Sequence, residues 1–420
     1  MPIESPYPMI SIEDALAIIQ NAIQPLPSIN IPFQTAPGYV LAEDVFANEP
    51  MPPFPASSVD GYAVVAADGP GKRRIVGDQA AGYMAGIEIE PGTSARVTTG
   101  APVPPGADAV VMVEEAEVIG DHVEILARNI QPGTNIRPIG QDIEQNQRVL
   151  AVGTVLGPPE LGLLGTVGRS NVTVYRRPKV AVMSTGDEIV EPHEQPAPGQ
   201  IRDANRFTLI GAVRQAGGEP LDLGIVRDKQ GSLQATIERG LTEADVLLTS
   251  GGVSMGQLDL VKPYLASRGT LHFGRVNTKP GKPVTFAVVD GVPCFAMPGF
   301  PVSALVSFEV FVRPALLKMA GHTNIYRPRE KAVLAHRFSH TAARTEFQRV
   351  VLTRRADGTL VASTTGFQGS GRLLSMVGAN GLVILPHGQD NYEAGAVVDA
   401  LILDRVEMED GVDKPHVSSL

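Results

Sequence analysis

Two glycine-rich turns that directly follow apolar strands dominate the middle third of this chain. Residues 179–184 (KVAVMS) run into the turn TGDE at 185–188, and residues 244–249 run into SGG at 250–252. Glycines after a buried strand let backbone N–H groups approach an anion, and ligands of open α/β sheets bind at the carboxyl ends of the strands. The sequence therefore predicts an α/β domain with a shared site for phosphate and metal at these strand ends.

The segment around these turns alternates apolar strands with helical patterns. We expect strands over residues 179–184, 221–226, 244–249, 284–289 and 293–297. We expect helices over residues 204–216, 230–240, 257–267 and 301–319. This alternation is typical of a doubly wound, mostly parallel sheet with helices on both faces.

The rest of the chain contains one well-signalled helix and many short β segments. Ser11 can cap a helix that begins after it, with Asp14 at the capping-box position. Residues 46–145 predict an antiparallel β domain, because short apolar runs alternate there with Gly and Pro. Residues 326–408 show the same pattern and predict a small β-barrel or sandwich.

Charge and cysteine content argue against several classes of function. The formal net charge is -10 over 420 residues, without a basic block, so we expect no binding to nucleic acid. The one cysteine, Cys294, excludes a disulfide within the chain and a cysteine-based zinc site, and we interpret it as a small core residue. No apolar run approaches the ~20 residues of a membrane span, and no signal peptide is recognised. We expect a soluble, cytoplasmic protein that does not bind membranes.

Three acidic residues follow three strands of the predicted sheet. Glu188, Asp228 and Asp259 each fall just after a strand or at the start of the next helix. Hard carboxylates beside a glycine turn suit Mg²⁺ bound together with a phosphate. A single acid at such a place would simply cap a helix or loop, whereas acids after three strands of one sheet favour a metal site.

A basic turn precedes the expected strand at 284–289. Lys279 and Lys282 lie in the run KPGKP, whose prolines fix φ and lower the entropic cost of holding the two charges in place. A rigid pair of cations suits an oxyanion, although a basic turn in water explains this motif alone equally well. Downstream, Ser303 falls in the first turn of the helix at 301–319, where free N–H groups can hold an anion.

Motifs along nearly the whole chain carry a resemblance to a known family. In order, they are SVDGYA at 58–63, TGAPVP at 99–104, GADAVV at 106–111, NIR at 135–137, TGDE at 185–188, TSGGVS at 249–254, KPGKP at 279–283 and PVSAL at 301–305. Each motif is weak alone, but the ordered set is highly specific. The chain resembles the molybdopterin molybdenumtransferases, the MoeA and gephyrin E-domain family of molybdenum insertases.

The resemblance implies a multidomain fold of α/β and all-β regions. These are a helical linker domain at 1–45 and 146–176, an inserted β domain at 46–145, a doubly wound α/β domain similar to molybdopterin adenylyltransferases at 177–325, a C-terminal β-barrel at 326–408, and a frayed tail at 409–420. The resemblance also implies a homodimer that converts molybdate and adenylylated molybdopterin into molybdenum cofactor and AMP with Mg²⁺. Candidate protein partners are molybdopterin adenylyltransferase and apo-molybdoenzymes.

The resemblance also assigns roles to individual residues. The acids Glu188, Asp228 and Asp259 would bind the metal and act in catalysis. Oxyanion and substrate contacts would come from Lys279, Lys282, Pro283, Ser303, Arg349 and Ser370, together with Ser250, Gly251 and Gly252. The inserted β domain would contribute catalytic positions that, in the family, complete the site from the partner subunit, namely Asp60, Thr99 and Asp142.

Two positions depart from the family pattern, Phe300 and Arg202, where Tyr or a similar residue often precedes the Asp. Phe300 stands where the family usually has Asn in a Gly-Asn-Pro turn, which removes an amide hydrogen-bonding group at the mouth of the site. Three alternatives remain: a paralogue that prefers tungstate, a molybdopterin adenylyltransferase, and a non-catalytic scaffold. The additional β domains and the lysine turn argue against adenylyl transfer, and the intact acids and lysines argue against a pure scaffold.

Overall fold

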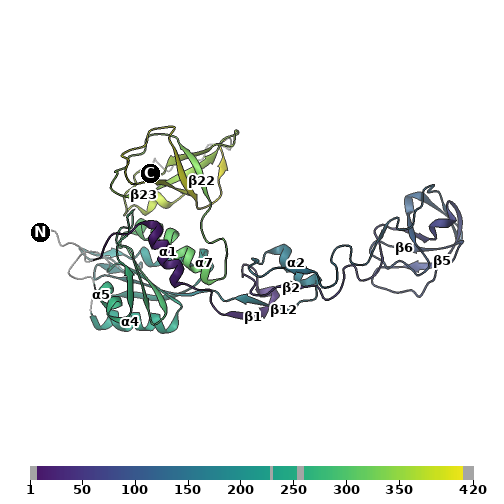
Figure 1. Ribbon diagram of the computed structural model, residues 1–420, viewed down its shortest axis with the longest axis horizontal. Coiled ribbons are helices and arrows are strands. Elements are labelled where there is room, and N and C mark those ends of the chain that lie inside the picture. The colour runs from purple at the N-terminus through teal and green to yellow at the C-terminus, as the bar shows by residue number, and fades with distance from the viewer. Residues whose placement is uncertain (1–6, 228–229, 253–259, 410–420) are drawn as a thin grey trace. The chain divides into compact units, whose positions relative to one another are not determined.

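A computed structural model describes residues 7–227, 230–252 and 260–409 (Figure 1). The described residues form two compact units. The larger is drawn from Met1–Asn30, Gly38–Ala42 and Thr173–Leu420, and the smaller comprises Ile31–Pro37 and Glu43–Val172. Most of the expected tail at 409–420 lies outside the described residues. Within the described ranges, no helix is long and apolar enough to cross a membrane.

The α/β part of the larger unit is built on a mixed sheet. Its strand order is β16 (Glu219–Val226), β13 (Lys179–Thr185), β17 (Val246–Ser250), β21 (Val292–Met297), β20 (Thr285–Val289) and β18 (Thr270–Phe273). The pairs from β16 to β21 are parallel, whereas β20 and β18 join as antiparallel strands. The predicted, mostly parallel α/β sheet is therefore confirmed.

The antiparallel edge of this sheet comes from a tight hairpin. Strands β20 and β21 are joined by Asp290 and Gly291, whose φ angles are 50 and 84. Positive φ at both central residues is what a type I′ turn requires, and Asp-Gly is a favoured pair for it. The apolar runs of the sequence predict both strands but not β18, which adds to the outer edge of the hairpin.

Helices cover both faces of the sheet, as predicted. Apolar side chains alternate along β13, so that Val180 and Val182 face one core while Ala181 and Met183 face the other. Figure 1 shows α1 and α7 on one side of the sheet and α4 and α5 on the other. The helices are α1 (Ile12–Ala22), α3 (Asn205–Gln215), α4 (Gln230–Glu243), α5 (Val261–Arg268), α6 (Pro301–Ser307) and, after a π-helical turn at Phe308–Val312, α7 (Arg313–Met319).

The first helix starts where its sequence predicts. The Ser11 hydroxyl oxygen accepts a hydrogen bond from the Asp14 backbone N–H at 2.9 Å. This contact satisfies one of the N–H groups that the first helical turn leaves free. On the inner face of α1, Ala15 and Ile19 are fully buried in the same core as Val180 of β13.

The C-terminal part of the larger unit is a closed β-barrel, which confirms the prediction. Strand β23 pairs with both β24 and β25, and this double pairing closes the ring. The barrel order is β23 (Thr345–Arg354), β24 (Leu360–Thr364), β22 (Arg329–Leu334), β26 (Val397–Ile402) and β25 (Gly381–Leu385). A two-residue strand of the lysine turn, β19 (Thr278–Lys279), also pairs with β23, in parallel, and β27 (Glu407–Met408) pairs with β23 near its end.

The smaller unit contains a β-sheet that is antiparallel except at one pair. Its order is β7 (Ala109–Met112), β4 (Gly61–Val64), β6 (Thr93–Val97), β5 (Gly71–Gln79), β9 (His122–Ile125) and β8 (Ala116–Ile119). The pair β5 and β6 is parallel, with a register shift between Ile75 and Gly77. The prediction of an all-antiparallel sheet was wrong at this pair, because the long segment between β5 and β6 returns the chain in the same direction.

Short elements complete the fold. Helix α2 (Pro158–Thr166) begins with Pro158 and Pro159, which suit the first turn because its N–H groups have no helical partner. The remaining strand pairs are β1 (Ser28–Pro32) with β12 (Asn171–Tyr175), β2 (Val45–Phe46) with β11 (Arg148–Leu150), β3 (Ala56–Ser57) with β10 (Ile136–Arg137), and β14 (Ile189–Val190) with β15 (Ile201–Arg202).

Candidate functional site

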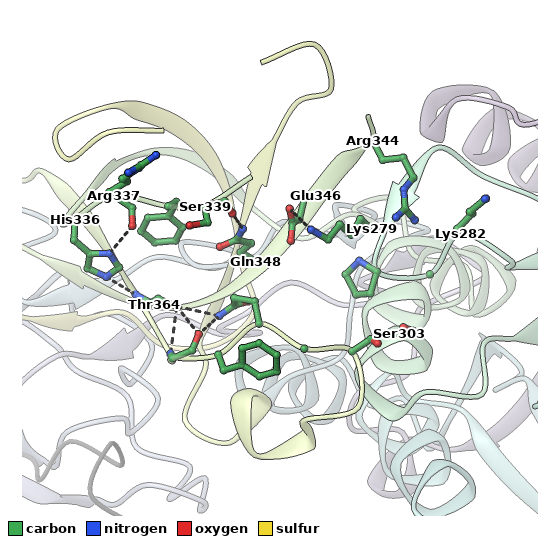
Figure 2. A pocket seen from close by; sticks show the side chains of 18 of the residues that line it. Lys279, Lys282, Ser303, His336, Arg337, Ser339, Arg344, Glu346, Gln348 and Thr364 are labelled. Carbon is green, nitrogen blue, oxygen red and sulfur yellow. Dashed lines mark hydrogen bonds and ion pairs between the residues drawn. The ribbon is translucent and has the colours of Figure 1, made fainter. Parts of the chain in front are cut away.

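A cavity of about 700 Å³ lies in the larger unit, between the lysine turn, the start of α6 and the barrel (Figure 2). It brings together segments that are far apart in the sequence. Its lining comprises Lys279, Pro280, Gly281, Lys282, Pro283, Ser303, His336, Arg337, Phe338, Ser339, Arg344, Glu346, Gln348, Thr364, Gly366, Phe367, Gln368, Gly369 and Ser370. Five residues proposed as oxyanion contacts from the sequence are in this wall: Lys279, Lys282, Pro283, Ser303 and Ser370.

Positive charge is concentrated in the cavity wall. Among the described residues that line it, Lys279, Lys282, Arg337 and Arg344 are cationic, and Glu346 is the acidic side chain. The chain as a whole has a formal net charge of -10. A concave surface of one sign in a protein of the opposite sign attracts ligands of opposite charge to that surface. The cavity is therefore suited to a small anion.

Lys279 is held in place by the barrel. Its strand β19 pairs with β23 so that Lys279 lies opposite Glu346. The Lys279 ammonium nitrogen is 3.0 Å from Oε2 of Glu346, whose side chain is 3% exposed, while Lys279 itself is 37% exposed. The buried carboxylate thus fixes the direction of a lysine that still reaches the cavity.

Lys282 presents a contrasting environment. Partial burial lowers the pKa of Lys282, and the positive charges of Arg275 and Arg344 lower it further. Within the described residues its side chain makes no ion pair. Figure 2 shows the Lys279 side chain turned towards Glu346 and the Lys282 side chain extending in another direction. A cation flanked by other cations gains from an anionic ligand, which would relieve the repulsion.

The start of α6 forms another part of the wall. Ser303 lies in its first turn and is 4% exposed. The backbone N–H of Val302 donates to the carbonyl oxygen of Ser370 at 3.1 Å, so the barrel loop is attached to this turn. Phe300 precedes the helix without a side-chain capping bond and is 62% exposed. Phe300 therefore provides no side-chain hydrogen bond at the start of α6.

Arg349 lies behind the cavity wall rather than in it. The residue is 1% exposed, and its guanidinium donates to Ser375 Oγ at 3.2 Å and to the carbonyl oxygen of Gly369 at 3.3 Å. Its backbone N–H donates to Gln368 Oε1 at 2.8 Å. Burial lowers the pKa of Arg349 to about 10, and the charge of Glu346 opposes that effect. Arg349 therefore supports the loop that carries Gly369 and Ser370.

The two glycine turns lie next to each other at the end of the sheet, as the sequence predicts. Thr185 Oγ1 donates to the carbonyl oxygen of Ser250 at 3.4 Å. Gly251 has φ 88, and a Cβ atom there would lie 2.6 Å from the Thr185 carbonyl oxygen, so a side chain is excluded. Asn205 Nδ2 donates to Ser250 Oγ at 2.6 Å and to the Gly299 carbonyl oxygen at 2.7 Å. These bonds attach the second glycine turn to the start of α6.

The predicted metal ligands are only partly within the described residues. Glu188 is exposed, and its carboxylate is the closest group to a Cβ atom placed on Gly186. Asp228 and Asp259 lie outside the described ranges. Across the residues that the structure does describe, no group of three or more His, Cys, Asp or Glu side chains could hold a metal ion. The described residues therefore do not by themselves make up a magnesium site.

The smaller unit contains the other predicted residues. Asp60 Oδ1 accepts hydrogen bonds from the backbone N–H of Thr99 at 2.7 Å and from its hydroxyl at 2.9 Å. The bond from the Thr99 backbone, followed by that from its side chain, lowers the pKa of Asp60. Asp142 pairs with Arg137. The structure thus brings Asp60 and Thr99 into direct contact.

Sequence reasoning missed several polar residues of the cavity. Glu346 and Gln348 lie on β23, where they are 2% and 3% exposed, and His340 is buried beside Glu346. A signal was present in the sequence: the run EFQR at 346–349 places polar side chains directly before the apolar run VVL of the same strand. Buried polar residues require partners, which makes such a strand a candidate for a functional site.

Fold and site together define a multidomain α/β protein with a cationic cavity beside a β-barrel. Comparison with protein-family models gives three matches in chain order. The MoeA N-terminal region (domain I and II) matches residues 10–168, a probable molybdopterin binding domain matches 181–318, and the MoeA C-terminal region (domain IV) matches 331–403.

Curated relatives match across almost the whole chain. Molybdopterin molybdenumtransferase 2 of Mycobacterium tuberculosis is 36% identical over 92% of this chain and 98% of its own length. Molybdopterin molybdenumtransferase of Haemophilus influenzae is 34% identical over 87% of this chain and 91% of its own. Gephyrin of Dictyostelium discoideum is 35% identical over 95% of this chain, which spans 63% of the length of that gephyrin.

Solved structures agree with these matches. The crystal structure of the molybdopterin biosynthesis MoeA protein from Pyrococcus horikoshii is 32% identical, covers 95% of this chain and 100% of its own, and superposes with a TM-score of 0.82. The chain belongs to the MoeA family of molybdopterin molybdenumtransferases.

Proposed function

We propose that this protein inserts molybdate into adenylylated molybdopterin, with release of AMP and formation of molybdenum cofactor. The observation that carries the proposal is the cationic cavity, in which Lys279 and Lys282 are presented by a turn attached to both the sheet and the barrel. Molybdate is a dianion, and fixed cations that need no rearrangement bind and orient such a group most effectively. Its relatives named as molybdopterin molybdenumtransferases support the same reaction.

Each side of the cavity would have its own part in binding. Lys279 and Lys282 would neutralise the oxyanion, and the hydroxyls of Ser303 and Ser370 would donate hydrogen bonds to it. Pro283 and Arg349 would fix the wall. The neighbouring glycine turn, Ser250 with Gly251 and Gly252, would hold phosphate oxygens of the adenylyl group through backbone N–H groups.

Magnesium is proposed as the cofactor, with Glu188, Asp228 and Asp259 as its ligands. Carboxylate oxygens are the ligands that Mg²⁺ prefers, and the bound ion would neutralise charge on the phosphate oxygens of the substrate. We expect Glu188→Ala to weaken the Mg²⁺ dependence of AMP release. An unchanged rate at limiting Mg²⁺ would mean that Glu188 is a surface charge and no ligand.

The proposal extends to a homodimer in which Asp60, Thr99 and Asp142 complete the site of the partner subunit. A chain carrying Asp60→Ala mixed with a chain carrying Lys282→Ala should then regain AMP release, because one site of a mixed dimer escapes both defects. Mixed dimers as inactive as their parents would contradict a shared site. Molybdopterin adenylyltransferase and apo-molybdoenzymes are the proposed protein partners, as supplier of the substrate and acceptors of the product.

An insertion assay distinguishes this function from its alternatives. Full-length protein is supplied with adenylylated molybdopterin, Mg²⁺ and either molybdate or tungstate, and AMP release and activation of an apo-molybdoenzyme are followed. Release of AMP that depends on molybdate supports the proposal. A preference for tungstate would identify a paralogue with altered metal specificity, and Phe300→Asn would be the first variant to test in that case. Adenylylation of molybdopterin from ATP would indicate adenylyl transfer instead. If neither set of substrates is turned over, the protein would be a non-catalytic scaffold.

A further inference from the structure

A buried histidine behind the cavity has no role in the function proposed so far. His340 lies in the segment that connects β22 to β23, and its side chain is 0% exposed. Its Nδ1 is 2.8 Å from Glu346 Oε2, and its Nε2 is 3.1 Å from the carbonyl oxygen of Pro386. The backbone N–H of His340 donates to Asn391 Oδ1 at 3.2 Å, which fixes the residue in place.

The two ring contacts determine how many protons the pair of His340 and Glu346 holds. A carbonyl oxygen and an ionised carboxylate both accept hydrogen bonds, whereas a neutral imidazole donates only one. A neutral ring facing an ionised Glu346 would therefore leave one ring nitrogen buried against an oxygen without a proton between them, which is costly. Both contacts are satisfied when the pair holds one further proton, as imidazolium and carboxylate or as imidazole and carboxylic acid. In either arrangement the pair has no net charge.

This proton count matters because Lys279 binds the same oxygen, Oε2 of Glu346, at 3.0 Å. If Glu346 were charged and uncompensated, it would cancel the charge of Lys279. With the extra proton, the three groups together keep one positive charge, which faces the cavity through Lys279. Arg349 also acts on Glu346 through its charge, but no hydrogen bond joins those two side chains in the described structure. The Tyr392 ring, 6.0 Å from the imidazole, completes the surroundings of His340.

We infer that His340 is a positioning residue for the oxyanion: it compensates Glu346, so that Glu346 orients Lys279 without neutralising it. The inference rests on the proposed function of the cavity as an oxyanion site. It adds two residues, His340 and Glu346, that act on the anion through Lys279 and do not touch it themselves.

The test uses sodium molybdate titrated calorimetrically into the full-length protein and into three variants. His340→Gln removes the proton that neutralises Glu346, so the carboxylate opposes the charge of Lys279 and binding should weaken about tenfold or more, the size of one charge-assisted contact. Glu346→Gln removes the charge and its orienting bond, so binding should stay within about fivefold of the wild type, the size of a screened ion pair. The double variant should regain the affinity of Glu346→Gln, because the uncompensated charge is gone.

Rescue of one variant by a second substitution is a result that a purely structural role of His340 would not produce. Glu330→Gln is the matched control, since Glu330 lies on barrel strand β22, pairs with Arg354 at 2.8 Å and is outside the cavity wall. This control should bind molybdate like the wild type. Wild-type affinity in His340→Gln, or a double variant as weak as His340→Gln, would overturn the inference.

Two further measurements separate the possible failures. Lys279→Ala should bind molybdate more weakly; equal binding by wild type and Lys279→Ala would overturn both the oxyanion site at Lys279 and the role of His340, whereas weaker binding by Lys279→Ala with wild-type binding by His340→Gln would overturn the role of His340 alone. If His340→Gln does not fold, the protons held by His340 and Glu346 can still be counted in the wild-type protein. Nuclear magnetic resonance of the imidazole nitrogens and of the Glu346 carboxyl carbon gives this number. One further proton on the pair supports the inference, and a neutral ring beside an ionised Glu346 refutes it.

Discussion

Replacing Arg349 by methionine should separate the stability of the barrel from anion binding. Arg349 as a whole residue is 1% exposed, and its guanidinium has no ion-pair partner within 4 Å among the described residues. Burial, opposed by the charge of Glu346, lowers the pKa of Arg349 from 12.5 to about 10. At about 1.4 kcal/mol per pKa unit, this change corresponds to about 3 to 4 kcal/mol by which burial, net of the Glu346 charge, disfavours the cation. Methionine removes that cost and fills much of the same space.

The two groups that accept hydrogen bonds from the Arg349 guanidinium each keep another hydrogen bond when Arg349 is replaced. Ser375 Oγ still donates to the Arg372 carbonyl oxygen at 2.7 Å, and the Gly369 carbonyl oxygen still accepts from the Arg372 N–H at 3.2 Å. We therefore expect the free energy of unfolding of Arg349→Met to lie within about 1 kcal/mol of the wild-type value. Molybdate affinity should fall about tenfold or more, because a buried cation behind the cavity wall is lost.

Urea denaturation and calorimetric titration with molybdate measure the two quantities. Arg354→Met is the matched control, because Arg354 is on the same strand, pairs with Glu330 and does not line the cavity; its molybdate affinity should not change. A loss of more than about 3 kcal/mol in Arg349→Met, the size seen when a buried ion pair is broken, would show that the charge has a structural partner. Unchanged affinity would show that the charge does not act on the cavity.

Three further outcomes are expected. Lys282→Ala should weaken molybdate binding about ten- to a hundredfold, the range for a charge-assisted contact, without lowering the melting temperature. Thr99→Val should raise the Asp60 pKa towards 3.8 in a carboxyl titration followed by nuclear magnetic resonance; the stability that this contact gives is present above pH 3.8 and is lost as pH falls through the lowered folded-state pKa. Burial raises the pKa of Cys294 to about 12, so a maleimide should label it slowly in native protein and quickly in urea.

The α/β sheet could be predicted because its signals are local. Apart from β18, each strand contains a short apolar run, and β13, β17 and β20 are followed directly by glycine or an acid. Ser11 marks the start of α1 by a bond within one helical turn. The parallel pairing of β5 and β6 in the smaller unit could not, because the direction of a strand depends on the path of the connecting segment and not on its own residues.

The candidate site was only half predictable for a related reason. Lys279 and Lys282 stand out because they belong to one rigid turn. Glu346, the partner of Lys279, and His340 beside it come from the barrel, and the contact between Lys279 and Glu346 depends on the register of β19 against β23. Register between distant segments is set by packing of the whole domain. A single sequence therefore identifies Glu346 as an acid within a strand but does not predict which cation it pairs with.

The pairing of β19 with β23 also connects the α/β domain to the barrel at the candidate site. The turn at 278–283 continues directly into β20 of the α/β sheet, yet its first residues are hydrogen-bonded into the barrel. The β19–β23 pairing and the contact between Lys279 and Glu346 therefore both connect the barrel to the turn that lines the cavity. Glu346 lies in the barrel and Lys279 in the turn, so exchanging the barrel alone would replace one partner of this ion pair and keep the other.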